Sequence, residues 1–92
     1  MNGGYIMLDC TGLDLIKGST PQTVTGIFER VKEAIATGKP IMAVNCTWGV
    51  LPVTPLFTFA IQFDANTIIC TASTLQIIIT SSDVITINNL VE

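Results

Sequence analysis

The sequence contains no histidine, and this absence narrows the chemistry that the chain can perform. Histidine is the side chain that most often acts as a general base near neutral pH and that activates cysteine or serine nucleophiles. An acid–base enzyme would have to use carboxylates, lysines or Tyr5, and no pair of these has the spacing of a shared site. The glycines form no phosphate-binding motif. We therefore expect no catalytic residues, no cofactor and no enzymatic activity.

Charge is also scarce, since only 12% of the residues are charged and the net charge is −3. The four lysines and arginines form no basic cluster, so nucleic acid is not an expected partner. Long apolar runs are absent too, because Thr, Ser, Asp or Asn interrupts each of them, and this excludes a membrane-spanning helix. Residues 1–4 lack the basic region and apolar core of a signal peptide. We expect a soluble protein without a membrane partner.

The cysteines, Cys10, Cys46 and Cys70, are few and widely spaced. Without a C-x-x-C pair or a histidine they supply neither a zinc site nor an activated nucleophile, and we expect buried, reduced thiols. Asp9 and Asp14 flank a glycine-bearing turn and could approach a cation, but the full ligand pattern of a calcium loop is missing. We interpret both as solvated turn carboxylates and expect no metal site.

Hydrophobic residues are abundant, at 49% of a 92-residue chain, which is enough for one folded domain over residues 1–92. Thr20 and Pro21 predict the start of a helix, and Gly38 followed by Pro40 predicts its end near Thr37. Within this span apolar residues recur at steps of three and four, which is typical of a helix with one buried stripe. The stripe comprises Val24, Ile27, Phe28, Val31, Ala34 and Ile35.

The rest of the chain has the alternation of β-strands. Strands at 5–10 and 41–46 flank the helix, an order that permits a right-handed crossover between parallel neighbours. The segment 47–55 contains glycine and prolines and is predicted to be a loop. Strands at 56–63, 68–72, 75–80 and 84–88 form hairpins. The predicted fold is α+β, with one helix on a mainly antiparallel sheet of about five or six short strands, ordered β-α-β and then a β-meander.

Alternation assigns Phe57, Phe59 and Ile61 to the sheet face beneath the helix. The opposite face still carries Tyr5, Ile69 and Ile78, where a solvated sheet would have polar residues. Trp48, within the predicted loop, adds to the exposed apolar surface. We interpret Tyr5, Trp48, Ile69 and Ile78 as a candidate interface. This interface predicts a homo-oligomer or packing on another protein.

Four stretches, residues 8–15 (LDCTGLDL), 34–40 (AIATGKP), 68–75 (IICTASTL) and 84–90 (VITINNL), are familiar as a set. Together they resemble small structural or tail-fibre-associated proteins of phages and prophages of Gram-positive gut bacteria. The resemblance implies an assembly role, with virion proteins or other copies of the chain as partners. We expect a protein that is cytoplasmic in the producing bacterium, and the resemblance leaves open whether it is an anchor or a decoration incorporated into the virion or a free accessory protein. It supplies no active-site residues.

A ligand-binding module is the alternative interpretation of the same exposed aromatic residues. Trp48 and Tyr5 could act as stacking platforms for a carbohydrate or another small ligand, beside the amides of Asn45 and Asn66. This reading requires these side chains to converge on one surface. Glycan binding that is lost in Trp48→Ala without unfolding would separate it from a packing role.

Overall fold

The computed structural model describes residues 4–16 and 21–89. In this part of the chain there are one helix and ten strands. They are β1 (Ile6–Asp9), β2 (Gln22–Thr23), α1 (Ile27–Thr37), β3 (Ile41–Val44), β4 (Cys46–Trp48), β5 (Leu51–Val53), β6 (Leu56–Phe57), β7 (Phe59–Asp64), β8 (Thr67–Ala72), β9 (Leu75–Thr80) and β10 (Val84–Asn89). The α+β class is confirmed, with more strands than predicted.

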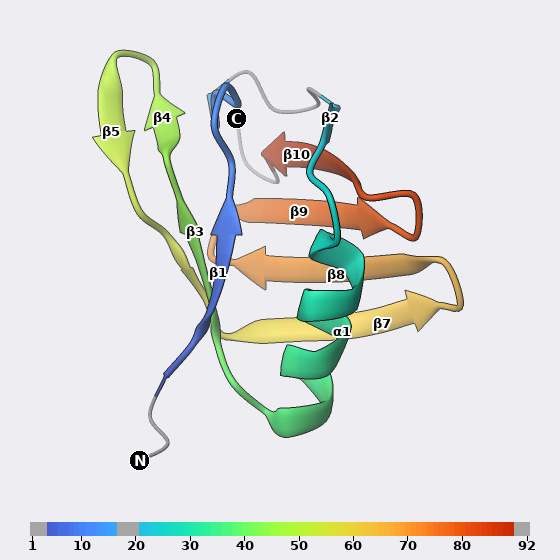
Figure 1. The fold of residues 1–92 in the computed structure, drawn as a ribbon. Helices are drawn as coiled ribbons and strands as arrows, with labels where there is room; N and C mark the ends of the chain where they lie inside the picture. Colours follow the sequence, from blue (N-terminus) through green and yellow to red (C-terminus); the bar gives the residue numbers. More distant parts are fainter. Residues whose placement is uncertain (1–3, 17–20, 90–92) are drawn as a thin grey trace.

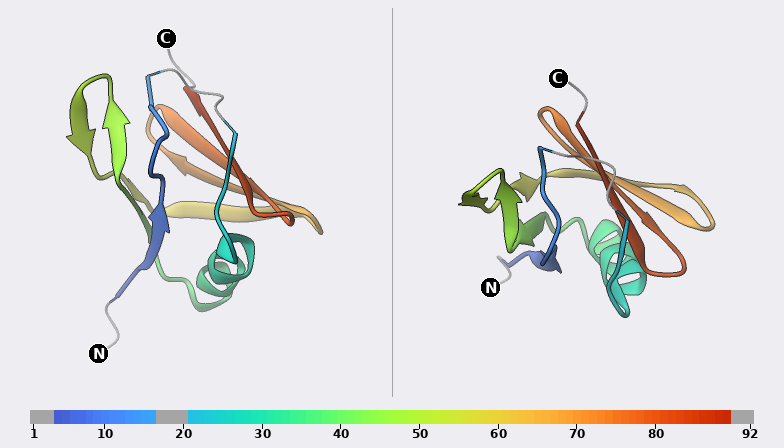
Figure 2. Two further views of the ribbon diagram at one scale, coloured as in Figure 1. Left: turned by 45° about the horizontal axis from the view of Figure 1, so that its top comes forward. Right: turned by 90° about the horizontal axis from the view of Figure 1, so that it is seen from above.

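The strands form two sheets and a separate hairpin. The large sheet has the order β2-β10-β9-β8-β7, the small sheet has the order β1-β3-β6, and β4 pairs only with β5. Helix α1 and the small sheet lie on the same side of the large sheet (Figures 1 and 2). One face of the large sheet is therefore covered by α1 and the small sheet, and no helix or strand of residues 4–16 and 21–89 covers the other face.

Strands β1 and β3 are parallel neighbours, with Ile6 opposite Ile41, and α1 lies in the connection between them. The element order differs from the predicted β-α-β because the short strand β2 precedes the helix. Gln22 and Thr23 pair there with the start of β10. No helix among residues 4–16 and 21–89 is long and apolar enough to cross a membrane.

The predicted start of the helix is wrong. The helix begins at Ile27, after Gly26 at φ 73°, while Pro21 and Val24 precede it and Thr20 lies outside the described residues. Its free amides are satisfied by Asp83, in the turn between β9 and β10. One carboxylate oxygen accepts from the Gly26 amide at 2.8 Å and the other from the Phe28 amide at 2.9 Å. Because the capping residue lies so far along the chain, the residues next to the helix start do not indicate where the helix begins.

We expect Asp83→Ala to destabilise the fold, because it removes both acceptors at the helix start and places alanine at φ 62°. The midpoint of thermal unfolding should fall by roughly 5–10 °C. Asp83→Asn is the matched control, since asparagine tolerates this backbone conformation and keeps one acceptor oxygen. A midpoint for Asp83→Ala equal to that of the wild type would contradict the capping role.

The same cap makes stability depend on pH. Hydrogen bonds from the Phe28 and Gly26 amides hold the pKa of Asp83 below its ordinary value of 3.8. A carboxyl whose pKa is lowered by folding stabilises the fold above its unfolded pKa, and this contribution is lost as the pH falls through the folded pKa. The advantage of the wild type over Asp83→Asn should therefore be full at pH 6 and shrink below about pH 4. Thermal unfolding across this range measures it, and an advantage that persists at pH 2 would contradict it.

The predicted end of the helix is confirmed. Gly38 adopts φ 79° and its amide donates to the Ala34 carbonyl at 2.8 Å, which closes the last turn. A side chain at this φ would be strained, so the glycine at this position permits the cap. The predicted stripe is buried at Ile27, Phe28, Val31 and Ala34.

The segment predicted to be a loop is instead the β4–β5 hairpin. Trp48 pairs with Leu51 across Gly49 (φ 68°) and Val50, and Cys46 pairs with Val53. Pro52 is tolerated because β5 is an edge strand that pairs only with β4 among the described residues, whereas the other edge of β4 is bridged at Thr47 to Asp14. The hairpin continues beyond the small sheet and projects from the body of the molecule (Figure 1).

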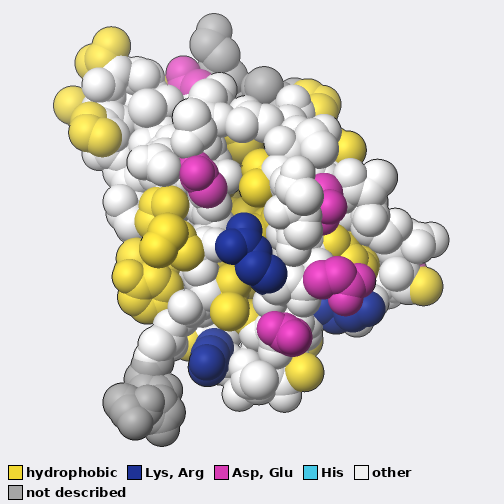
Figure 3. All heavy atoms as spheres, in the orientation of Figure 1, with side chains coloured by type: hydrophobic (Ala, Val, Ile, Leu, Met, Phe, Trp, Pro, Cys, Tyr) yellow, Lys and Arg dark blue, Asp and Glu magenta, His cyan; other side chains and the backbone are white. Residues whose placement is uncertain are grey.

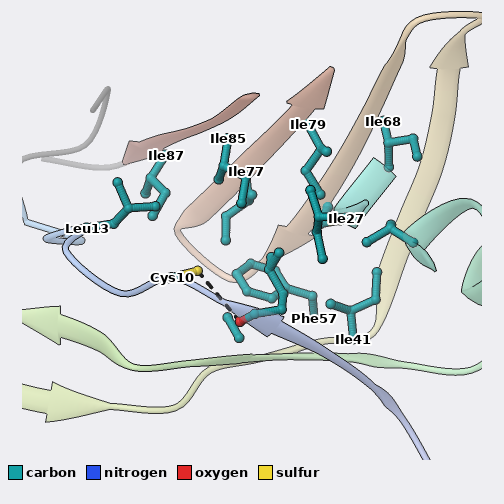
Figure 4. Close-up of a cluster of buried hydrophobic side chains, with 14 of the residues drawn as sticks. Cys10, Leu13, Ile27, Ile41, Phe57, Ile68, Ile77, Ile79, Ile85 and Ile87 are labelled. Atoms are coloured by element: carbon teal, nitrogen blue, oxygen red, sulfur yellow. Dashed lines mark hydrogen bonds between the residues drawn. The ribbon is translucent and has the colours of Figure 1, made fainter. Parts of the chain in front are cut away.

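The predicted meander is confirmed from β8 to β10, which pair in antiparallel register. Their inward side chains are a set of fully buried isoleucines, Ile68, Ile77, Ile79, Ile85 and Ile87. Phe57, from β6, is also fully buried and lies between these isoleucines and the residues of β1 and β3 (Figure 4). The two sheets and the helix thus share one hydrophobic core.

Candidate protein-interaction surface

The most exposed apolar side chains of the large sheet lie on its edge strand, β7. Phe59 is 60% exposed, Ile61 41% and Phe63 65%, and we call these three residues the β7 stripe. β7 is the last strand in the order of the large sheet, and β8 is its only partner among the strands that the structure describes. The stripe therefore combines exposed apolar side chains with a backbone edge that no described strand pairs with.

The stripe corrects the prediction that Phe59 and Ile61 pack under the helix. Thr58 separates β6 from β7, and the chain passes there from the small sheet to the large sheet. Phe57 points into the core, whereas on β7 the inward position opposite Cys70 is filled by Ala60. A small residue at that position leaves room for α1, which packs on β7. The alternation identifies the strand correctly but assigns the wrong face.

Two predicted interface residues, Ile69 and Ile78, continue the stripe across the outer face. Ile61 is opposite Ile69, and Ile69 is opposite Ile78. We call these three the isoleucine row. The neighbouring cross-strand row consists of Phe59, Thr71, Gln76 and Asn88. Between Pro40 and Asn89 the sequence has only two charged residues, Asp64 at the end of β7 and Asp83 at the helix cap. The outer face is therefore nearly free of charge.

The other two predicted interface residues lie elsewhere. Tyr5 is 47% exposed and precedes β1, where it shares the outer side of the small sheet with Met7 and Leu56. Trp48 is 40% exposed and lies at the tip of the β4–β5 hairpin with Val50 and Leu51. Figure 3 shows apolar side chains on the small sheet and at this tip, and charged side chains mainly around α1. The candidate interface is thus divided among three surfaces.

This division also separates the groups that a carbohydrate site would need. Tyr5 is level with the start of β3, whereas Trp48 lies beyond the far end of that strand. Asn45 donates to the Asp9 carboxylate at 2.9 Å. Asn66 is in the turn between β7 and β8, on the large sheet. The structure brings Tyr5, Trp48 and Asn66 to no common surface.

Asp9 and Asp14 both hold turns together. One oxygen of Asp9 accepts from the Thr11 amide and hydroxyl and from Asn45, which lowers the pKa of this carboxyl, chiefly through Thr11. Asp14 accepts from the Ile16 amide and, at 3.2 Å, from the Gly49 amide of the hairpin. Among the described residues no three potential ligands are grouped to hold a metal ion.

The three thiols are buried in the core and unpaired by disulfides. The interaction between the neighbouring Cys10 and Cys46 thiols lowers the pKa of Cys46 and, together with burial, raises the pKa of Cys10. The Cys10 thiol donates to the Leu8 carbonyl, and the Cys46 thiol donates to the Val44 carbonyl. Burial in an apolar setting raises the pKa of Cys70 to about 12. Cys46 is therefore the thiol most readily ionised, although its side chain is out of solvent.

We expect native protein to react with a thiol-specific disulfide reagent at least ~100-fold more slowly than unfolded protein, since the reagent requires an opening of the core. Rapid modification of all three thiols in the native state would contradict this arrangement.

The sequence does not predict the β7 stripe, because the periodicity of a half-buried strand does not indicate which of its two faces is buried. A signal is present in the composition, since the buried strand positions on β8, β9 and β10 are mostly isoleucine while β7 has alanine, glutamine and aspartate at its alternate positions.

Comparisons of the chain with protein families, with curated proteins and with solved structures find no match.

Proposed function

We propose that this chain is a non-catalytic structural or assembly module of a phage or prophage particle, and that it works by packing against protein. The observation that carries the packing role is the β7 stripe on a nearly uncharged sheet face. Large exposed apolar groups on a small domain mark surfaces that another protein covers. The assignment to a particle comes from the resemblance of the four sequence stretches to virion-associated proteins.

Several properties of the site support packing over ligand chemistry. The outer face offers threonine and amide side chains around the isoleucine row, which resembles the polar rim and apolar centre of protein interfaces. The thiols lie in the core and the Asp9 and Asp14 carboxylates are engaged in turns. The face is also built from strands, as suits contact with another sheet or strand.

Incorporation into a particle tests the proposal. Particles released from the producing bacterium would be purified on a density gradient and analysed by quantitative mass spectrometry. We expect the chain to migrate with the particles at a fixed copy number. A tagged chain with Phe59→Ser and Phe63→Ser should be excluded, whereas a tagged chain with Val50→Ser should be incorporated. A chain found only outside the particles would refute the assembly role.

A further inference from the structure

We propose that two copies of this chain join edge to edge through β7, so that the large sheet continues from one copy into the other. This inference names one partner for the packing surface of the proposed function and rests on it. The free edge of β7 is the starting point. No strand of residues 4–16 and 21–89 other than β8 pairs with it, and Figure 1 shows it at the end of the sheet.

The β7 edge lacks most of the features that prevent strands from pairing with other chains. Natural edges are protected by lysine, proline, inward charges, bulges or a covering segment. The six residues of β7, Phe59–Asp64, include neither lysine nor proline, and their only charge is Asp64 at the end. A bulge between Gln62 and Asp64 limits regular pairing with β8 at that end. The strand from Phe59 to Gln62 remains a regular template.

The sequence of β7 is complementary to itself in antiparallel register. A two-fold axis at Ile61 places Ile61 opposite its own copy and Ala60 opposite Gln62 of the second copy, within the regular part of β7. Phe59 then comes next to the bulged end at Phe63 of the second copy, and Asp64 lies toward Thr58, so no two carboxylates are brought together although each copy carries a net charge of −3. The isoleucine row would continue without a break from one copy into the other. A closed symmetric pair of this kind uses the same patch twice.

The exposed area fits a weak dimer. At 60%, 41% and 65% exposure, the β7 stripe presents about 300 Å² of apolar side chain per copy. Two copies present about 600 Å², and edge pairing covers only the part of it that faces the other copy, because the side chains stand perpendicular to the sheet. The covered apolar area is therefore below the apolar share of the smallest specific interfaces, those near 1,200 Å² in total. Main-chain hydrogen bonds along the edge add to this contact. The dimer should therefore form at micromolar to millimolar concentrations.

Sedimentation equilibrium on the purified chain tests the pairing. We expect the mass to rise from 9.8 kDa toward twice that value over about 1 µM to 1 mM. Ile61→Lys should weaken dimerisation at least 10-fold with an unchanged thermal midpoint in dilute solution, because it adds a charge to the paired edge. Val50→Lys, the same kind of change at the hairpin tip, should have no effect. A wild type that is monomeric throughout, or an Ile61→Lys variant that dimerises normally, overturns the proposal.

Cross-linking gives a second readout that does not depend on a destabilising change. Opposed residues in antiparallel strands have Cβ atoms about 4.5–5.5 Å apart, close to disulfide geometry, so Ile61→Cys should form a covalent dimer under mild oxidation. Ile78→Cys lies two strands from the edge and should not. Cross-linking through Ile78→Cys instead would overturn edge pairing. These measurements use the isolated protein. A negative result would therefore overturn the dimer without deciding whether the chain is incorporated into a particle, which the density-gradient experiment tests.

Discussion

Phe57→Ala and Phe59→Ala should differ sharply in stability, although the two residues are two positions apart in one predicted strand. Phe57 is fully buried at the junction of the sheets, and removing its ring should lower the free energy of unfolding by about 3–5 kcal/mol. Phe59 is 60% exposed, so Phe59→Ala should cost less than about 1 kcal/mol.

Urea unfolding of both variants measures this contrast. The protein should be dilute, because association through β7 would add an apparent stability that the Phe59→Ala variant lacks. Equal and large losses in the two variants would show that both rings are in the core, as simple alternation predicts. Equal and small losses would show that Phe57 is not the contact between the sheets.

Phe28→Ala should have the second large effect, about 3–5 kcal/mol, because this ring is only 3% exposed and joins α1 to the core. Phe28→Leu retains most of the buried volume and should cost less than about 2 kcal/mol. The Lys32 ammonium lies 5.7 Å from the centre of the Phe28 ring. Lys32→Ala removes this contact and should lower the free energy of unfolding by less than about 1 kcal/mol. A loss below about 1 kcal/mol in Phe28→Ala would contradict its place in the core.

Features encoded by local patterns could be predicted from the sequence. The buried helix stripe from Ile27 to Ala34 and the stop at Gly38 follow from spacing and from one glycine. The strands β8, β9 and β10 follow from alternation between short polar turns. These signals are local because helix and strand periodicity are properties of consecutive residues.

Features that depend on distant contacts could not be predicted. The helix start depends on Asp83, which follows it by more than 50 residues in the chain. Strand pairing in the β4–β5 hairpin outweighs the weak propensity of Pro52 and Gly49. The face of β7 depends on the change of sheet at Thr58 and on the room that α1 requires.

The candidate surface could be predicted only in part. Alternation places Ile69 and Ile78 on the outer face, where both are half-buried, because an apolar residue on the polar side of a strand is visible in the sequence. Phe59 and Ile61, which alternation places in the core, are instead exposed on the outer face together with Phe63. Strong hydrophobicity alone does not separate a core strand from an interface strand, since both bury apolar groups in the final assembly.

Residue-resolved NMR during dilution tests the central claim, that β7 is the surface through which this chain packs against protein. Amide resonances of uniformly ¹⁵N-labelled protein would be followed from about 1 mM to about 10 µM. We expect shifts and amide-exchange protection to change along Phe59–Asp64 and in adjacent β8, with α1 and the β4–β5 hairpin unchanged. Changes centred on Trp48 and Val50 or on Tyr5 and Met7, or no change at any residue, would contradict the claim.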